Sequence, residues 1–211
     1  MKKVYKNTFP ICFINETTLI TFKKGYFYSL NLNTGNISKI KKMNLPFKEK
    51  VLNTIPLLSR IFRRGIRCGT KVSDYIILFV YGQKIFELNI NERTISSGYE
   101  TPDHSRPLIF SKFEKIMGFK DGIYFGGYRN NPKKTPISIY RRIKTDKWEE
   151  VFHFQSNKIE HIHNIIPDPF NNVVYILTGD FNNSAGIWIA TNDFKSVNPI
   201  LVGKQEYRGA V

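Results

Sequence analysis

His161 and His163 are the residues of this chain whose type and spacing most directly suggest chemistry. They stand two positions apart in an apolar stretch that is expected to be a strand, so both imidazoles should lie on one face of it. The chain then turns at Asp168-Pro169 and returns as a second apolar run that ends at Thr178-Gly179-Asp180. An imidazole titrates near neutral pH, and a carboxylate can orient it as a general acid or base. We therefore predict that His161, His163 and Asp180 are catalytic.

Two other interpretations of the histidine pair stay open. A metal ion would need a third and usually a fourth ligand, and the candidates nearby in sequence are Asp180, Gln205 and Glu206. Alternatively, the histidines are structural and hydrogen-bond between neighbouring sheets, as polar residues on inner strands usually do. We expect no cofactor, with a metal ion at the histidine pair as the alternative.

The composition is that of a globular protein. The chain has 211 residues, of which 41% are hydrophobic and 14% aromatic, enough for a sizeable core. Cys12 and Cys68 have neither metal-binding spacing nor the pattern of a secreted disulfide framework, which favours a reducing, cytoplasmic location. The most apolar window, 75–81, is too short to cross a bilayer, so we predict no membrane insertion.

The chain is strongly basic, with a formal net charge of +15 and a pI near 9.8. Such a charge attracts nucleic acid or anionic surfaces non-specifically. One dense cluster contains Arg60, Arg63, Arg64 and Arg67, but no nucleic-acid-binding motif accompanies it. We therefore predict solvated basic faces and no specific nucleic-acid partner.

Short runs rich in Ile, Val, Phe and Tyr, separated by Asn, Gly, Asp and Pro, predict an all-β protein. Four of these runs share one pattern: an aromatic-bearing strand, a polar turn and a further short strand. They lie at 25–31, 82–89, 137–140 and 186–189. A return at intervals of roughly 50 residues is typical of β-propeller blades with four strands each.

The repeat predicts one domain over 1–211 with about four blades. The predicted blades are 11–40, 65–97, 106–152 and 159–201, and 207–211 is predicted to be the first strand of a further blade. A propeller needs closure to remove its sheet edges, so we expect a truncated propeller, or a small one whose last strand completes the first blade. Residues 52–62 suit a short helix or an extended crossover, with Pro56 against the helix.

Several motifs in the second half of the chain occur together. They are Arg106-Pro107, Gly122-Ile123-Tyr124-Phe125-Gly126-Gly127-Tyr128, Asn131, His161-Ile162-His163, Asp168-Pro169, Thr178-Gly179-Asp180, Gly186-Ile187-Trp188, Gln205 and Tyr207-Arg208. This set resembles the sialidase-like propellers with BNR or Asp-box repeats, which are often labelled glycosyl hydrolases. The turns at 144–148 and 191–194 are degenerate as Asp boxes, and the arginine triad and Tyr–Glu pair of a sialidase have no clear counterparts.

The resemblance implies a protein that binds an acidic or surface-polysaccharide glycan. The first strand of each propeller blade lines the central channel, so residues that open different blades are expected to converge there. The predicted ligand contacts are Arg106, Tyr128, Asn131, Gln205, Tyr207 and Arg208. Hydrolysis stays open, because it needs two carboxyl groups and Asp180 is the one that can be placed.

Two functions of other classes remain as alternatives. One is a non-catalytic propeller that serves as a platform for a protein partner. The other is a metal-dependent lyase or hydrolase that uses His161 and His163.

Overall fold

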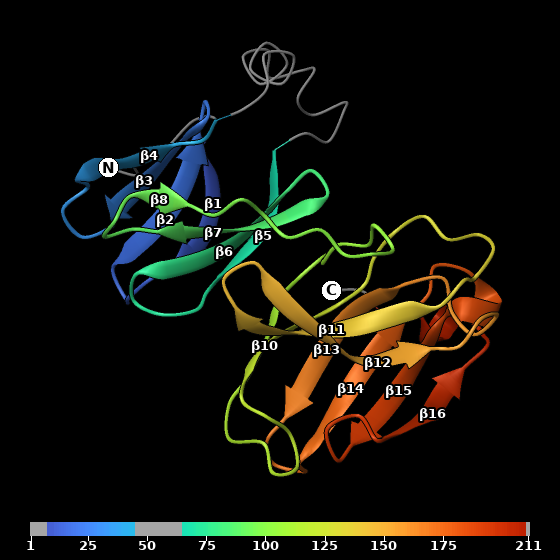
Figure 1. Ribbon diagram of the computed structural model, residues 1–211. Helices are drawn as coiled ribbons and strands as arrows, with labels where there is room; N and C mark the ends of the chain where they lie inside the picture. The colour runs from blue at the N-terminus through green and yellow to red at the C-terminus, as the bar shows by residue number, and fades with distance from the viewer. Residues whose placement is uncertain (1–7, 45–64, 210–211) are drawn as a thin grey trace. The chain divides into compact units, whose positions relative to one another are not determined.

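The computed structural model describes residues 8–44 and 65–209 (Figure 1). The predicted helix or crossover at 52–62, the arginines at 60, 63 and 64, and residues 210–211 lie outside the described residues. The chain divides into two compact units, residues 1–99 and 100–211, which we call the first and the second unit. None of the helical segments in the described ranges has the length and apolar character that crossing a bilayer requires.

Each unit contains two antiparallel sheets of four strands. The first unit comprises β1 (Phe9–Phe13), β2 (Thr18–Lys23), β3 (Tyr26–Asn31) and β4 (Ile37–Lys42), then β5 (Ile66–Lys71), β6 (Ile76–Tyr81), β7 (Lys84–Asn89) and β8 (Thr94–Ile95). The second unit comprises β9 (Ser111–Phe113), β10 (Gly122–Gly126), β11 (Ile137–Lys144) and β12 (Lys147–Phe154), then β13 (Ile162–Asp168), β14 (Val173–Thr178), β15 (Gly186–Thr191) and β16 (Ser196–Val202). Two short 3-10 turns, η1 (Asn182–Ser184) and η2 (Gln205–Tyr207), complete the described elements.

Every sheet is a meander, in which each strand pairs with the next one along the chain. This connectivity is that of a propeller blade, and the predicted all-β class is confirmed. The third sheet begins at β9 rather than at Arg106, which instead pairs with Tyr128 in an isolated bridge. Of the segment 207–211, predicted to open a further blade, Tyr207 ends the 3-10 turn η2 and residues 208 and 209 are in neither a helix nor a strand.

Tight hairpins make these meanders possible. Between β2 and β3, Lys24 and Gly25 both have positive φ, at 48° and 81°, while Lys23 and Tyr26 still pair. Two positive φ values in a two-residue loop match the right-handed twist of the flanking strands. Glycine accepts this conformation without a steric cost, and Gly82, in the turn before β7, has a positive φ of 62° as well.

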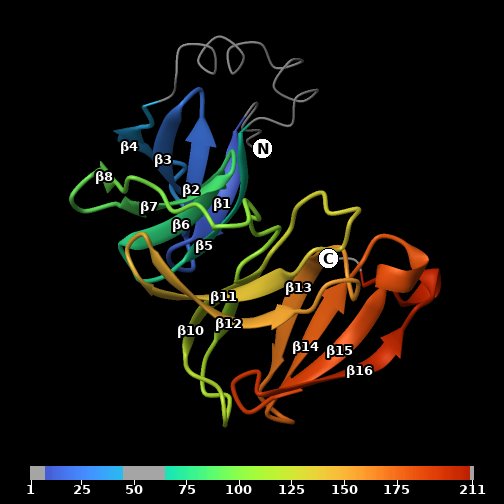
Figure 2. The same ribbon diagram turned by 45° about the vertical axis from the view of Figure 1, so that its right-hand side comes forward.

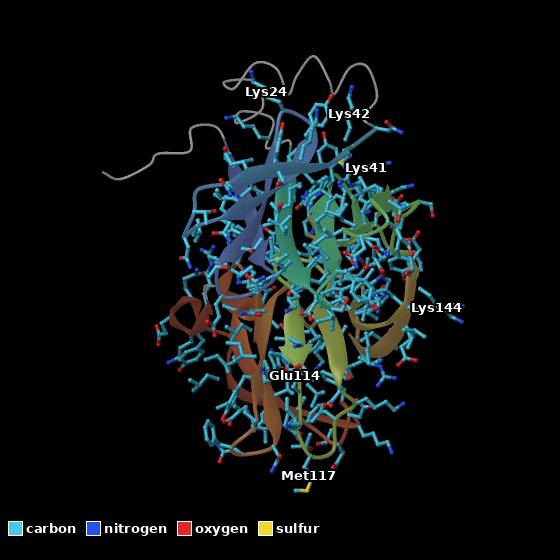
Figure 3. The ribbon with its side chains drawn as sticks, turned by 90° about the vertical axis from the view of Figure 1, so that its left-hand side faces the viewer. Lys24, Lys41, Lys42, Glu114, Met117 and Lys144 are labelled. Atoms are coloured by element: carbon cyan, nitrogen blue, oxygen red, sulfur yellow. The ribbon has the colours of Figure 1, made fainter. Side chains whose placement is uncertain are left out.

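The core of the first unit lies between its two sheets. Ile20 and Phe27 from the first sheet, and Ile77 and Phe79 from the second, are fully buried in one apolar cluster. The rings of Phe27 and Phe79 meet with centroids 4.8 Å apart. Figure 2 shows the two sheets that carry them, β1–β4 and β5–β8, beside each other. Lys24, Lys41 and Lys42 are exposed, in agreement with solvated basic residues (Figure 3).

In the second unit the two sheets meet along β10 and β13. Phe113 stacks on Tyr124 at 4.0 Å inside a buried apolar cluster that also includes Ile162 of β13. A Cβ added to Gly126 would lie 2.2 Å from a methyl carbon of Ile162, so the missing side chain of Gly126 is what lets β13 approach. The backbone N–H of Ile162 donates to the carbonyl of Gly127 at 3.0 Å. This junction fixes the strand that carries the histidine pair.

We predict that Phe79→Ala destabilises the first unit by about 3–5 kcal/mol, because it removes a buried ring from the contact between the two sheets. Equilibrium denaturation of the full chain measures this change. Phe13→Ala, which removes an exposed ring from the same unit, serves as the control and should change stability by less than about 0.5 kcal/mol. Equal effects of the two substitutions would contradict the description of the core.

Burial raises the pKa of the Cys12 thiol to about 11, with the nearby Lys71 charge acting in the opposite direction. In a Cys68→Ser variant, we therefore predict that alkylation of Cys12 by iodoacetamide is slow at pH 8 and speeds up roughly tenfold per pH unit to pH 10, following the thiolate fraction. Mass spectrometry of samples quenched over time gives the rate. The denatured chain is the control. A folded-state rate that levels off near pH 9 would contradict the prediction.

Candidate functional site

The two predicted histidines lie side by side in the second unit. His161 immediately precedes β13, His163 is within it, and a register shift in its pairing with β14 falls between Ile162 and Asn164. Their Nε2 atoms are 3.2 Å apart, and their side chains are only 6% and 7% exposed. Two imidazoles two residues apart on one strand thus meet at their Nε2 atoms.

Asp180 meets this pair from the end of the neighbouring strand. Its Oδ2 lies 3.1 Å from His161 Nε2, and its Oδ1 lies 3.3 Å from His163 Nε2. The preceding Gly179 has a φ of +96°, and a Cβ there would lie 2.2 Å from the carbonyl oxygen of Ser184. The Gly179 N–H also donates to the carbonyl of His161 at 3.2 Å. Glycine at this position therefore lets the chain turn so that the carboxylate reaches both imidazoles.

A third segment, which follows β16, completes the arrangement. Arg208 places a guanidinium nitrogen 2.8 Å from Asp180 Oδ1, and the carbonyl of Gly209 lies 2.7 Å from His163 Nδ1. The side chain of Arg208 is 48% exposed and that of Asp180 is 24% exposed. We call His161, His163, Asp180 and Arg208 the His–Asp site. Its imidazoles are buried, and its carboxylate and guanidinium face solvent.

Tyr128 lies against the imidazoles of the His–Asp site. Its ring centroid is 4.4 Å from that of His161 and 6.2 Å from that of His163. The backbone bridge to Arg106 holds Tyr128 in place, with N–H···O distances of 2.9 and 3.1 Å. The structure therefore brings five of the predicted residues together, namely His161, His163, Asp180, Arg208 and Tyr128.

Burial is the main influence on the pKa of His161. It lowers the pKa of His161, and the charge of His163 acts in the same direction, while Asp180 and the backbone of Arg129 oppose the shift. The neutral imidazole is therefore favoured at His161. Its Nδ1 atom is buried and makes no hydrogen bond within the described part of the chain.

Asn131 has a different position from the one expected of a ligand contact. Its Nδ2 donates to the carbonyls of Thr135 and Glu160 at 2.8 and 3.0 Å. Its Oδ1 accepts hydrogen bonds from Arg129, from the Thr135 N–H and from the Thr135 hydroxyl. This buried amide thus closes the loop after Tyr128 and ties it to the residue that precedes His161.

The other predicted contacts lie around the His–Asp site without a defined part in it. Gln205 is exposed and Tyr207 is half-buried, both in the turn η2 that leads to Arg208. Arg106 contributes its backbone to the bridge with Tyr128. Sequence reasoning missed the carbonyl of Gly209, since a backbone acceptor leaves no residue-type signal.

Replacing Asn131 by Ala should destabilise the second unit by about 2–4 kcal/mol, because it removes a buried amide that donates to the carbonyls of Thr135 and Glu160 and accepts three further hydrogen bonds. Denaturant unfolding followed by tryptophan fluorescence measures the loss. Asn198→Ala is the matched control, because the Asn198 side chain is exposed and bonds only its neighbour Ser196 among the described residues. A small effect at Asn131, similar to that at Asn198, would speak against a structural amide and for a ligand contact.

Comparisons with known proteins identify the fold and no family. No protein-family model matches this sequence, and no curated protein matches it. Among solved structures, Raptor from Chaetomium thermophilum aligns with a TM-score of 0.56 and 8% identity over 92% of this chain and 16% of its own. Regucalcin from Agrobacterium tumefaciens, described as a calcium-binding protein, has a TM-score of 0.53 and 13% identity over 92% of this chain and 57% of its own. A chain of a nidogen/laminin complex has a TM-score of 0.51 and 7% identity over 89% of this chain and 60% of its own.

The chain spans less than two thirds of each of these structures. At such low identities the similarity concerns the fold alone. Together with the four meander sheets, it confirms the predicted β-propeller of about four blades. Neither a family model nor a curated protein supports the sialidase-like family, so only the propeller part of that resemblance is confirmed.

Proposed function

We propose that this propeller binds an acidic glycan through Arg208 and Tyr128 of its second unit. The observation that carries the proposal is the half-exposed guanidinium of Arg208, which Asp180 holds on one side. A guanidinium has five N–H donors arranged as a fork that matches a carboxylate. One ion pair with Asp180 uses a minority of these donors, so the N–H groups on the solvent side can donate to the carboxylate of an acidic sugar.

Tyr128 supports the same proposal. Sugar-binding sites combine an aromatic surface with a small number of placed polar groups. Tyr128 is half-buried and packs against His161, so its ring is held in a fixed orientation beside the buried pair. An ordered ring loses little conformational entropy on contact with a ligand.

The proposal is one of binding rather than of hydrolysis. Glycoside hydrolysis needs two carboxyl groups that flank the scissile bond. Asp180 is one such group and is already paired with Arg208. Glu206, the acidic residue closest in sequence to Arg208, is exposed, and its Oε1 lies 3.7 Å from Lys204 Nζ. We therefore propose binding of the glycan without its hydrolysis.

A platform for a protein partner is the second candidate function. Met117 and Phe170 are both strongly exposed in turns of the second unit, and Figure 3 shows Met117. The Met117 N–H donates to Asn172 Oδ1 at 2.9 Å, which joins the two turns. Exposed apolar side chains on neighbouring turns are a feature of protein-binding surfaces. A Met117→Ser, Phe170→Ser variant that keeps glycan binding would separate the two functions.

The glycan proposal predicts that the full chain binds a polyuronate more tightly than the corresponding neutral polysaccharide. Arg208→Gln should weaken binding of the polyuronate at least about tenfold, because it removes the charged fork. Isothermal titration calorimetry at fixed ionic strength measures both affinities. Arg93→Gln, which removes the same charge from an exposed turn of the first unit, is the control for non-specific attraction. Equal losses in the two variants, or equal affinity for the neutral polysaccharide, would overturn the proposal.

A further inference from the structure

With both imidazoles neutral, the His–Asp site has too few hydrogen atoms for the contacts between its acceptors. The Nδ1 atom of His163 lies 2.7 Å from the carbonyl oxygen of Gly209. A carbonyl only accepts, so Nδ1 carries the proton and donates it. A neutral His163 then has a lone pair on Nε2. This lone pair faces His161 Nε2 at 3.2 Å and Asp180 Oδ1 at 3.3 Å.

A neutral His161 cannot supply the missing hydrogen atom. If its single proton is on Nε2, that N–H can serve His163 or Asp180, and the lone pair of His163 still faces the carboxylate. If the proton is on Nδ1, three acceptors meet with no hydrogen between them, since the carboxylate accepts only. Buried acceptors in such contact are costly unless a proton or a cation lies between them.

The distances between the acceptors match the space that a metal ion occupies. The Nε2 atoms are 3.2 Å apart, and the carboxylate oxygens lie 3.1 and 3.3 Å from them. A tetrahedral ion with metal–ligand bonds of about 2.0–2.1 Å has ligands roughly 3.3 Å apart. The three side chains would therefore hold an ion with little movement, and their ligand atoms all lie within 4.8 Å of one another.

We propose that His161, His163 and Asp180 bind a divalent transition-metal ion, with the two Nε2 atoms and a carboxylate oxygen as its ligands. Two imidazoles and one carboxylate suit Zn²⁺ or Fe²⁺, whereas Ca²⁺ and Mg²⁺ prefer oxygen ligands. Three protein ligands leave at least one coordination position open for water or a ligand. The exposed side of Asp180 and Arg208 is where that position would meet solvent.

The groups that surround these three side chains are also those of a metal site. A ligating histidine usually donates its other N–H to a carbonyl, and a ligating carboxylate is itself hydrogen-bonded. The Gly209 carbonyl has the first role at His163 Nδ1, and Arg208 has the second at Asp180 Oδ1. Arg208 is thus a positioning residue for the metal site. The proposal goes beyond glycan binding and is independent of it, because the ion can bind without any sugar.

The test uses the full chain after chelator treatment and dialysis, with ZnCl₂ as the probe. Calorimetry and elemental analysis should give one Zn²⁺ per chain, and CaCl₂ at the same concentration should not bind in its place. His163→Ala and Asp180→Asn should each weaken Zn²⁺ binding at least about 100-fold, and Arg208→Gln by about tenfold, the range of groups that orient a ligand. No Zn²⁺ on the wild-type chain would overturn the proposal.

The chain contains its own control. Its other two histidines, His104 and His153, are exposed and lie beside Glu100 and Glu150. A His104→Ala, His153→Ala variant should bind Zn²⁺ with unchanged affinity. If that variant loses the ion, the ion belongs to surface histidines and the proposal is wrong.

A measurement on the wild-type chain tests the proposal even if the site variants do not fold. Long-range ¹H–¹⁵N spectra report the protonation of each imidazole nitrogen. On addition of Zn²⁺, the Nε2 signals of His161 and His163 should both shift, while His163 Nδ1 keeps its proton. Finding His163 as an imidazolium that Zn²⁺ does not displace would overturn the proposal. If the chain binds polyuronate but no metal, the glycan proposal stands and the metal site is wrong. If it binds Zn²⁺ but no polyuronate, the metal site stands and the glycan proposal is wrong.

Discussion

The junction between β10 and β13 is the constraint on which the second unit depends. The Ile162 N–H donates to the carbonyl of Gly127 at 3.0 Å, and the Ile162 side chain fills the space that Gly126 leaves open. A side chain at Gly126 would force the two strands apart, because its Cβ would lie 2.2 Å from a methyl carbon of Ile162. The flanking histidines, Tyr128 and the loop closed by Asn131 all take their positions from this contact.

Three separate segments then meet at the histidines. His161 and His163 come with β13, Asp180 comes from the turn after β14, and Arg208 with the Gly209 carbonyl comes from the segment after β16. Asp180 faces both Nε2 atoms, and the Gly209 carbonyl accepts the hydrogen bond of His163 Nδ1. The stability of this region and the chemistry of the His–Asp site therefore rest on the same hydrogen bonds, which links ligand binding to the order of the last segment.

Local sequence patterns predicted much of this structure. The aromatic strands followed by polar turns predicted four-stranded blades, because strand periodicity and hairpin geometry act over a few residues. The i, i+2 spacing predicted that His161 and His163 share a face. The prediction for Asn131 was a ligand contact, whereas in the structure its amide closes a loop and donates to the carbonyl of Glu160, the residue before His161. A polar residue next to a predicted site can serve the ligand or the backbone, and residue type alone does not separate the two.

By itself, the sequence determined the all-β class, the meander blades, the paired imidazoles and the basic surface, all of which follow from residue type and short-range spacing. Only the tertiary structure decided that Asp180 faces both Nε2 atoms and that the Gly209 carbonyl fixes the proton on His163 Nδ1. These contacts join residues far apart in the chain, so they depend on how strands pack and turns close. A backbone carbonyl, moreover, is common to every residue and has no signature in the sequence.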